Sequence, residues 1–258
     1  MKRIFAAAGL AAALCGPARG GEQVAVYRAT GSDARLFEQY DNDGYSLEIA
    51  ANPDGSLEMT VRVSDAPLAS VSPFPVARGD VASEGLAPAP ERDAFARAAV
   101  EGSRTQVEAV RRLLLQIARE VQYDPDRLRM QDPAAVFTSR KAYCVGFAEL
   151  AVDLLRRVGI SARTVQGILR TGPEDPAFDS SIGGAYHRWI EVYYPDRGFV
   201  FSDPHLSVNG VDARYVPFST RALTRPKALH VTALTTTGEL RYDPIHLGDE
   251  TLRVRAVK

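Results

Sequence analysis

The chain has 258 residues, enough for one large domain or for one domain with a small appendage. Hydrophobic residues make up 45% and charged residues 24%, which is ordinary for a soluble globular protein. The net charge is −1, and lysine and arginine are spread along the chain without an aromatic-interleaved patch, so nucleic acid is not an expected partner.

Residues 1–20 have the pattern of a cleavable signal peptide. Lys2 and Arg3 precede an apolar run over residues 4–15, and small residues then lead to Gly20. The run is too short to span a bilayer comfortably. We therefore expect cleavage after Gly20 and a periplasmic or secreted protein without stable membrane insertion. A membrane anchor and a buried N-terminal helix are the alternatives.

The two cysteines have different expected fates. Lipid attachment at Cys15 would normally require a small residue just before it, and Leu14 stands there instead. After signal cleavage only Cys144 remains, so no internal disulfide can form. In an oxidising compartment such a leftover thiol is either buried and inert or reactive.

Residues 21–65 are expected to form a small antiparallel β meander, an N-terminal appendage. In the stretch SLEMTVRV, apolar and polar residues alternate, and the turn sequence NPDG precedes it. Residues 66–91 contain five prolines and keep no period, which indicates a linker or a surface loop.

Two helices are expected next. Ser103 and Gln106 have the spacing of a capping box, and an apolar stripe of period three to four follows as far as Val121. The second helix covers residues 144–158, and Gly159 is a natural residue to end it.

The chain beyond the second helix is expected to be mostly β-strand. Strands are predicted at residues 160–169, 186–194 and 199–203, with the turn PDRG between the last two, and shorter runs such as HVTAL and TLRVRAV follow. Helices followed by antiparallel strands indicate the α+β class.

Cys144 stands where a helix begins, and this placement favours a reactive thiol. Free N–H groups and the partial positive charge of a helix N-terminus stabilise a thiolate, which is the form that nucleophilic catalysis needs. A buried, inert thiol is the alternative. As a base, His187 is the candidate among four histidines, because strand alternation puts it on one face with Trp189, where the two could line a cleft. A hydrogen-bonded core histidine is the alternative.

Asp203 is the candidate partner that orients His187. The two residues are sixteen apart, and the turn at residues 195–198 lies near their midpoint. An antiparallel hairpin closed by that turn would place Asp203 across from His187. A register slip of one residue would move Asp203 to the other face.

Three separated blocks resemble the core of the transglutaminase-like superfamily. They are YCVGFAELAVDLLRRVGISARTV, YHRWIEVYY and FVFSDP, and the similarity covers roughly residues 105–218. The resemblance implies a papain-like fold, with a catalytic helix packed on an antiparallel sheet, in a catalytic domain over residues 92–258 that includes a C-terminal β extension. It also implies an exported bacterial member of the family.

The resemblance implies a triad in which Cys144 is the nucleophile, His187 the base and then the acid, and Asp203 the orienting group. Trp189 and Tyr143 are the implied substrate-binding residues. The chain departs from the family pattern at Ala142, where a glycine is frequent, and at Arg188, where a small residue is frequent. On strand alternation Arg188 should point away from the site.

The implied activity is cleavage or transfer of peptide or isopeptide acyl groups through a Cys144 thioester, with hydrolysis favoured over cross-linking. The expected partner is a protein or peptide substrate, cell-wall peptides included, and no cofactor or metal is expected. The alternatives are an acyl transfer similar to that of arylamine N-acetyltransferases and a non-catalytic binding or assembly module on the same scaffold. A second oxyanion donor, beside the Cys144 N–H, is left open among Gln122, Tyr123 and Gln131.

Overall fold

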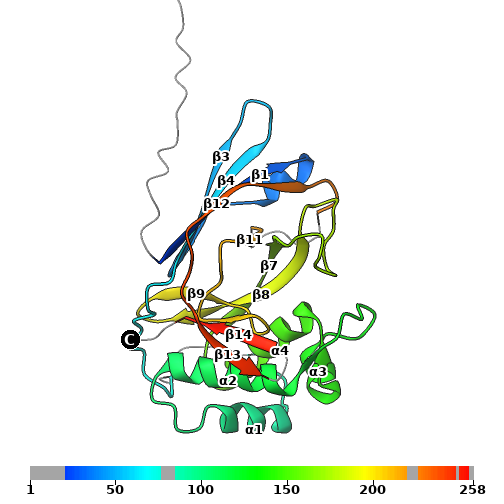
Figure 1. The fold of residues 1–258 in the computed structure, drawn as a ribbon. Coiled ribbons are helices and arrows are strands. Elements are labelled where there is room, and N and C mark those ends of the chain that lie inside the picture. The colour runs from blue at the N-terminus through cyan, green and yellow to red at the C-terminus, as the bar shows by residue number, and fades with distance from the viewer. Residues whose placement is uncertain (1–20, 77–84, 220–225, 248–249, 256–258) are drawn as a thin grey trace, which may run out of the picture.

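The computed structural model describes residues 21–76, 85–219, 226–247 and 250–255. The predicted signal peptide at residues 1–20 therefore lies outside the described residues. In the described part of the chain, no helix has the length and apolar character needed to cross a bilayer. The elements form an α+β architecture in which two antiparallel sheets and a helical layer are stacked (Figure 1).

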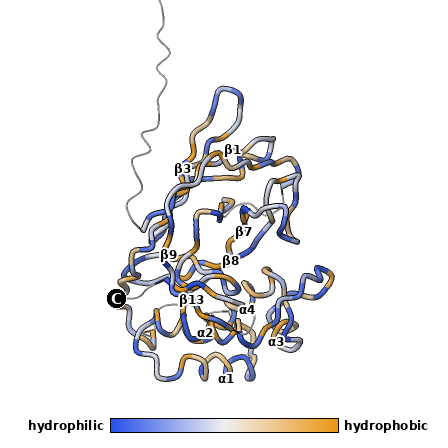
Figure 2. Tube along the Cα trace, viewed as in Figure 1, coloured by the Kyte–Doolittle hydropathy of each residue, from blue (hydrophilic) through white to orange (hydrophobic). Residues whose placement is uncertain are grey.

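The N-terminal strands form the outer sheet, whose strand order is β12-β1-β4-β3-β2. Its members are β1 (Glu22–Thr30), β2 (Tyr40–Asn42), β3 (Tyr45–Ala51), β4 (Leu57–Ser64) and β12 (His230–Thr237). A short 3-10 helix, η1 (Ser32–Leu36), follows β1. The meander predicted for residues 21–65 is thus extended by a strand from the C-terminal part of the chain, which pairs with β1. Figure 2 shows that the tip of the β3–β4 hairpin is hydrophilic.

The second sheet has the strand order β11-β7-β8-β9. It contains β7 (Ala162–Leu169), β8 (Ala185–Tyr194), β9 (Gly198–Ser202) and β11 (Tyr215–Pro217), all antiparallel to their neighbours. The predicted strands therefore match the observed ones to within two residues. Three further strands pair beside this sheet, β10 (Ser207–Val208), β13 (Asp243–Leu247) and β14 (Glu250–Val254).

The four α-helices of the described residues lie on one side of the second sheet, and α4 packs directly on β7 and β8. They are α1 (Pro90–Ala99), α2 (Gln106–Glu120), α3 (Pro133–Ser139) and α4 (Cys144–Arg157). The apolar stripes of α2 and α4 pack into one core with Ile190 and Val192 of β8. On the opposite face of β8, Trp189 packs into a second core with residues of the N-terminal sheet, such as Tyr27 and Tyr45. The strand β8 therefore lies between two hydrophobic cores.

The helix α2 begins two residues later than its predicted cap. Its N-cap is Thr105, whose hydroxyl accepts a hydrogen bond from the Glu108 N–H at 3.2 Å. The predicted pair is wrong because the Ser103 hydroxyl is buried without a hydrogen-bond partner, while the Gln106 amide donates to the Tyr193 carbonyl at 2.5 Å. The sequence also contains the spacing T-x-x-E, and the structure uses its threonine as the N-cap, while the Glu108 carboxylate accepts the backbone N–H of Arg104 at 3.1 Å. The helices α1 and α3 were not anticipated.

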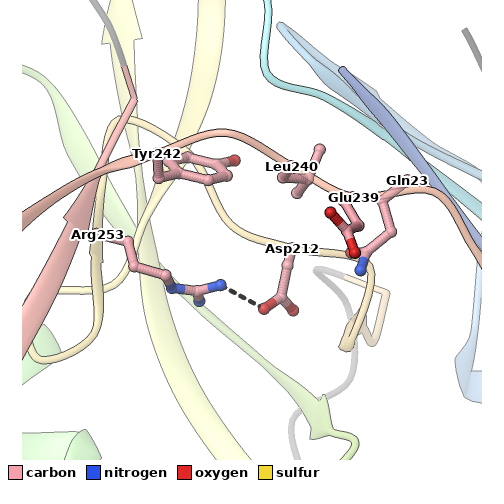
Figure 3. A pocket seen from close by; sticks show the side chains of 6 residues that line it. All are labelled: Gln23, Asp212, Glu239, Leu240, Tyr242 and Arg253. Carbon is pink, nitrogen blue, oxygen red and sulfur yellow. Dashed lines mark hydrogen bonds and ion pairs between the residues drawn. The ribbon is translucent and has the colours of Figure 1, made fainter. Parts of the chain in front are cut away.

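A polar hollow of about 300 Å³ lies between the N-terminal sheet and the C-terminal strands. Arg253 donates to Asp212 across it at 2.6 Å (Figure 3). Its remaining lining residues are Gln23, Glu239, Leu240 and Tyr242. None of the predicted triad residues lines this hollow.

Two cap variants test the assigned start of α2. Replacing an N-cap threonine with alanine leaves an N–H group without its acceptor, so Thr105→Ala should lower the free energy of unfolding by about 1 kcal/mol in urea denaturation. Ser103→Ala is the matched control and should change it by less than about 0.5 kcal/mol, because its hydroxyl has no partner to lose. A larger loss for Ser103→Ala than for Thr105→Ala would contradict the assignment.

Candidate active site

The first residue of α4 is Cys144, and the loop before it is held by the half-buried side-chain amide of Gln131. Gln131 accepts hydrogen bonds from the backbone N–H groups of Tyr143 and Gly146, each at 3.1 Å. A short parallel bridge between β5 (Gln122–Tyr123) and β6 (Lys141–Ala142) fixes the same loop from the other side. Cys144 as a whole residue is half-buried. This framework presents the sulfur at a helix N-terminus, where free N–H groups favour a thiolate.

His187 lies on β8 within hydrogen-bonding reach of the Cys144 thiol. Its Nε2 atom contacts the Asp203 carboxylate at 2.6 Å, which leaves Nδ1 to face the sulfur. The opposite residue on β7 is Gly167, and a Cβ there would lie 2.6 Å from a ring atom of Trp189. The glycine therefore provides the space in which the His187–Trp189 pair packs.

Asp203 reaches His187 diagonally, not from directly across the hairpin. The β8–β9 ladder pairs Ile190 with Ser202, so the next step places Asp203 level with Trp189. The predicted direct opposition is wrong by two residues, because the ladder is centred on residue 196 and not 195. An even offset keeps Asp203 on the same face as His187, and side chains at such diagonal positions remain within reach.

Asp203 is buried and has three donors around it. The Tyr215 hydroxyl donates to Oδ2 at 2.8 Å, and the His205 backbone N–H donates to Oδ1 at 3.0 Å. The Nε2 atom of His187 also hydrogen-bonds to Oδ2. Tyr215 also packs edge-on against the imidazole, with ring centroids 5.7 Å apart. Tyr215 was not predicted as a site residue. It lies on a short strand twelve residues after Asp203, and no sequence motif distinguishes it from other tyrosines.

The electrostatics of the three groups favour a thiolate–imidazolium pair. Burial opposes ionisation of Cys144, but the hydrogen bond and charge of His187 and the backbone N–H of Arg188 outweigh it and lower the pKa of the thiol. Burial also opposes the charged form of His187, yet the Asp203 carboxylate and the Cys144 sulfur raise the pKa of the imidazole to about 10. Burial disfavours the Asp203 carboxylate, but His187 and the surrounding donors hold the pKa of Asp203 at about 2.

Trp189 does not occupy the predicted position on a substrate-binding wall. Its side chain is fully buried and stacks against the imidazole of His187, with centroids 6.1 Å apart and 19° between the planes. A residue with no exposed surface supports the imidazole and does not contact substrate in this arrangement. Tyr143, which is partly exposed as the N-cap of α4, remains a predicted substrate contact.

Ala142 and Arg188, the two departures from the family pattern, do not separate Cys144, His187 and Asp203. Arg188 extends its side chain to Glu149 on α4 at 2.7 Å, while its backbone N–H interacts with the Cys144 sulfur. Ala142 is buried in the β5–β6 bridge. Within the described ranges, no group of three or more histidine, cysteine, aspartate or glutamate side chains is placed to hold a metal ion.

Comparisons with known proteins agree with the resemblance noted in the sequence. Residues 93–204 match the family model described as transglutaminase-like superfamily. A segment of 76 residues is 36% identical to the uncharacterised protein YebA of Bacillus subtilis (strain 168), covering 27% of this chain and 10% of YebA.

Two solved bacterial structures align with this chain at low sequence identity. A candidate cysteine protease from Cytophaga hutchinsonii aligns with a TM-score of 0.48 and 16% identity over 86% of this chain and 92% of its own. The periplasmic domain of TgpA from Pseudomonas aeruginosa, bound to ethylmercury, aligns with a TM-score of 0.44 and 18% identity over 72% and 73% of the two chains.

The ion pair can be tested by alkylating Cys144 with iodoacetamide across pH. The alkylation midpoint should lie below about 8.5, the free-thiol value, because the His187 imidazolium stabilises the thiolate. His187→Ala should move the midpoint up towards about 8.5, whereas His246→Ala, at an exposed histidine of β13, should leave it unchanged. Identical profiles for wild type and His187→Ala would exclude the pair.

Proposed function

We propose that the protein is a cysteine enzyme that cleaves or transfers amide acyl groups through a Cys144 thioester, which is consistent with the match of residues 93–204 to the family model described as transglutaminase-like superfamily. The observation that supports this most strongly is the continuous contact from the thiol through His187 to the buried Asp203 carboxylate. Nucleophile, base and orienting group are thus present in one chain of contacts, as thiol acyl transfer requires.

The reaction follows from the charges of these groups. The thiol proton is held by His187, so the Cys144 thiolate attacks the carbonyl carbon of an amide, and the new S–C bond moves an electron pair onto the carbonyl oxygen. When that oxyanion collapses, His187 donates its proton to the departing amine and the C–N bond breaks. The product of this half-reaction is an acyl thioester on Cys144 and a neutral imidazole.

The second half-reaction decides between hydrolysis and transfer. His187 then removes a proton from water, and the resulting hydroxide attacks the thioester to release a carboxylic acid, or it assists a primary amine to form a new amide. Partial exposure of Cys144 gives water a path to the thioester. We therefore place hydrolysis of peptide or isopeptide bonds ahead of cross-linking.

The proposed substrate is a protein or peptide outside the cytoplasm, cell-wall peptides included. Support for this location comes from the signal-like pattern of residues 1–20. N-terminal sequencing of the protein recovered from the periplasm or medium of an expressing bacterium should begin at Gly21. An intact Met1 in that fraction would contradict export by cleavage.

The thioester is tested with p-nitrophenyl acetate, whose leaving group reports acylation directly. Wild type should release a burst of p-nitrophenol equal to the enzyme concentration, and Cys144→Ala should release none above background. Mass spectrometry of the quenched burst should find the acetyl group on Cys144. A folded wild-type protein that shows no burst would support the alternative of a non-catalytic module.

Hydrolysis and transfer are separated by offering a peptide mixture with and without a primary amine. Release of free acid at equal rates in both mixtures is the expected result, whereas incorporation of the amine would favour cross-linking. Cys144→Ala provides the background for both measurements.

Asp203→Asn tests the orienting carboxylate. The amide cannot carry the charge that raises the pKa of His187, so the imidazolium should be lost at lower pH and the acylation rate should fall by about 10²- to 10⁴-fold at neutral pH. The upper limb of the pH profile of p-nitrophenol release should move to lower pH. A profile like that of wild type would show that Asp203 does not control the imidazole.

A further inference from the structure

A thioester mechanism needs more than one donor for the developing oxyanion. The backbone N–H of Cys144 is placed to be the first, since it lies at the helix N-terminus. Three side chains upstream of the nucleophile were candidates for the second, Gln122, Tyr123 and Gln131. The structure distinguishes among them by what each side chain already contacts.

Gln131 is committed to the loop that presents the nucleophile. Its Oε1 atom accepts the N–H groups of Tyr143 and Gly146, and its Nε2 atom donates to the Arg129 carbonyl at 3.2 Å. Turning the amide towards a substrate would break the two bonds that cap α4. Gln131 therefore positions the loop and is not available to donate.

Gln122 and Tyr123 are neighbours on β5, and their side chains have opposite environments. Gln122 is exposed, whereas Tyr123 is partly buried and packs against the helical core. The β5–β6 bridge pairs Tyr123 with Ala142, two residues before Cys144, and the Asp124 N–H donates to the Ala142 carbonyl at 2.8 Å. The tyrosine is thus tied by its backbone to the strand that leads into the nucleophile.

The Tyr123 ring is held in one orientation by His205. The two rings are stacked with centroids 4.7 Å apart and 19° between their planes, and His205 also contacts Phe147 of α4 at 5.0 Å. The backbone N–H of the same His205 donates to Asp203. One residue therefore connects the orienting carboxylate to the tyrosine.

The Tyr123 phenol keeps its O–H proton at neutral pH and is therefore a hydrogen-bond donor. Burial is the main cause that raises the pKa of Tyr123, and the charge of the Cys144 thiolate is the second. A group whose ionisation is opposed by the thiolate keeps its O–H proton. This proton can be shared with an oxyanion that forms on a carbonyl bonded to the same sulfur.

We propose that the Tyr123 hydroxyl is the second oxyanion donor and that His205 is a positioning residue which holds its ring, an inference that rests on the proposed thioester chemistry of Cys144. The hydroxyl donates to the carbonyl oxygen as the S–C bond forms and releases it when the intermediate collapses. No proton is transferred from the phenol, so the tyrosine is unchanged at the end of the cycle.

Tyr123→Phe removes the hydroxyl and keeps the ring, which makes it the decisive variant. The rate of p-nitrophenol release from p-nitrophenyl acetate should fall by about 10²-fold, the usual effect of losing one oxyanion donor. The rate and pH midpoint of Cys144 alkylation by iodoacetamide should stay within about twofold and about 0.3 pH units of wild type, because displacement of iodide forms no oxyanion. Wild-type acylation by Tyr123→Phe would overturn the proposal.

The alkylation measurement distinguishes failure of the Tyr123 proposal from failure of the proposed function. A parallel loss of acylation and alkylation in Tyr123→Phe would show that the tyrosine supports the nucleophile itself, which overturns its role as oxyanion donor and leaves the Cys144 chemistry standing. A wild-type protein that alkylates with a lowered midpoint and never acylates would overturn the proposed function, and the oxyanion donor with it.

His205 is tested by coupling to Tyr123. His205→Ala should lower the acylation rate in the wild-type background, and His205→Phe, which keeps a stacking ring, should restore most of it. In the Tyr123→Phe background, His205→Ala should cause no further loss, since the hydroxyl that it positions is already gone. Independent, multiplicative losses in the double variant would show that His205 acts on stability or on Asp203 instead.

Discussion

The hydrogen bond between His187 and Asp203 is the interaction on which the rest of the site depends. At 2.6 Å, with both side chains nearly removed from solvent, it joins an imidazole and a carboxylate whose burial alone would favour their neutral forms. The pair keeps both groups charged, because each compensates the other in a region of low dielectric. The charged imidazole and its hydrogen bond are in turn the main causes that lower the pKa of the Cys144 thiol, ahead of the Arg188 backbone N–H.

The N-terminal sheet packs against the face of β8 that carries His187 and so supports the His187–Asp203 pair. Trp189 and Glu191 lie on the same face of β8 as His187, and both are fully buried against residues of the outer layer. Glu191 accepts hydrogen bonds from Tyr40 of the outer sheet and from Arg163 of β7. The Tyr45 hydroxyl donates to the backbone carbonyl of Tyr215 at 2.7 Å, which links the outer sheet to the strand that contacts Asp203. The β meander thus closes the back of the sheet that carries the imidazole.

The sequence predicted the composition of the site better than its geometry. Strand alternation puts His187 and Trp189 on one face, and any even register offset keeps Asp203 there, so the prediction of proximity survived an error of two residues. Alternation alone cannot show which face is covered by a second layer, and so the burial of Trp189 was missed. Tyr215 joins the site through strand pairing between β11 and β7, which no local pattern encodes. Likewise, T-x-x-E and S-x-x-Q both occur at the start of α2, and only the loop geometry selects Thr105 as the N-cap.

Strand β8 carries charged groups away from solvent and also has to hold the imidazole in place. Its position between two hydrophobic cores explains how it can do both. A buried imidazolium and carboxylate are costly relative to apolar residues of the same volume, and the indole N–H of Trp189 is buried without a partner. Packing from the helices on one face and from the outer sheet on the other keeps the imidazole from moving away from the thiol. A triad on a single-layered strand would have to rely on the His187–Asp203 bond alone, and water would compete for it. The second layer therefore contributes to the proposed reactivity of Cys144 through the position of His187.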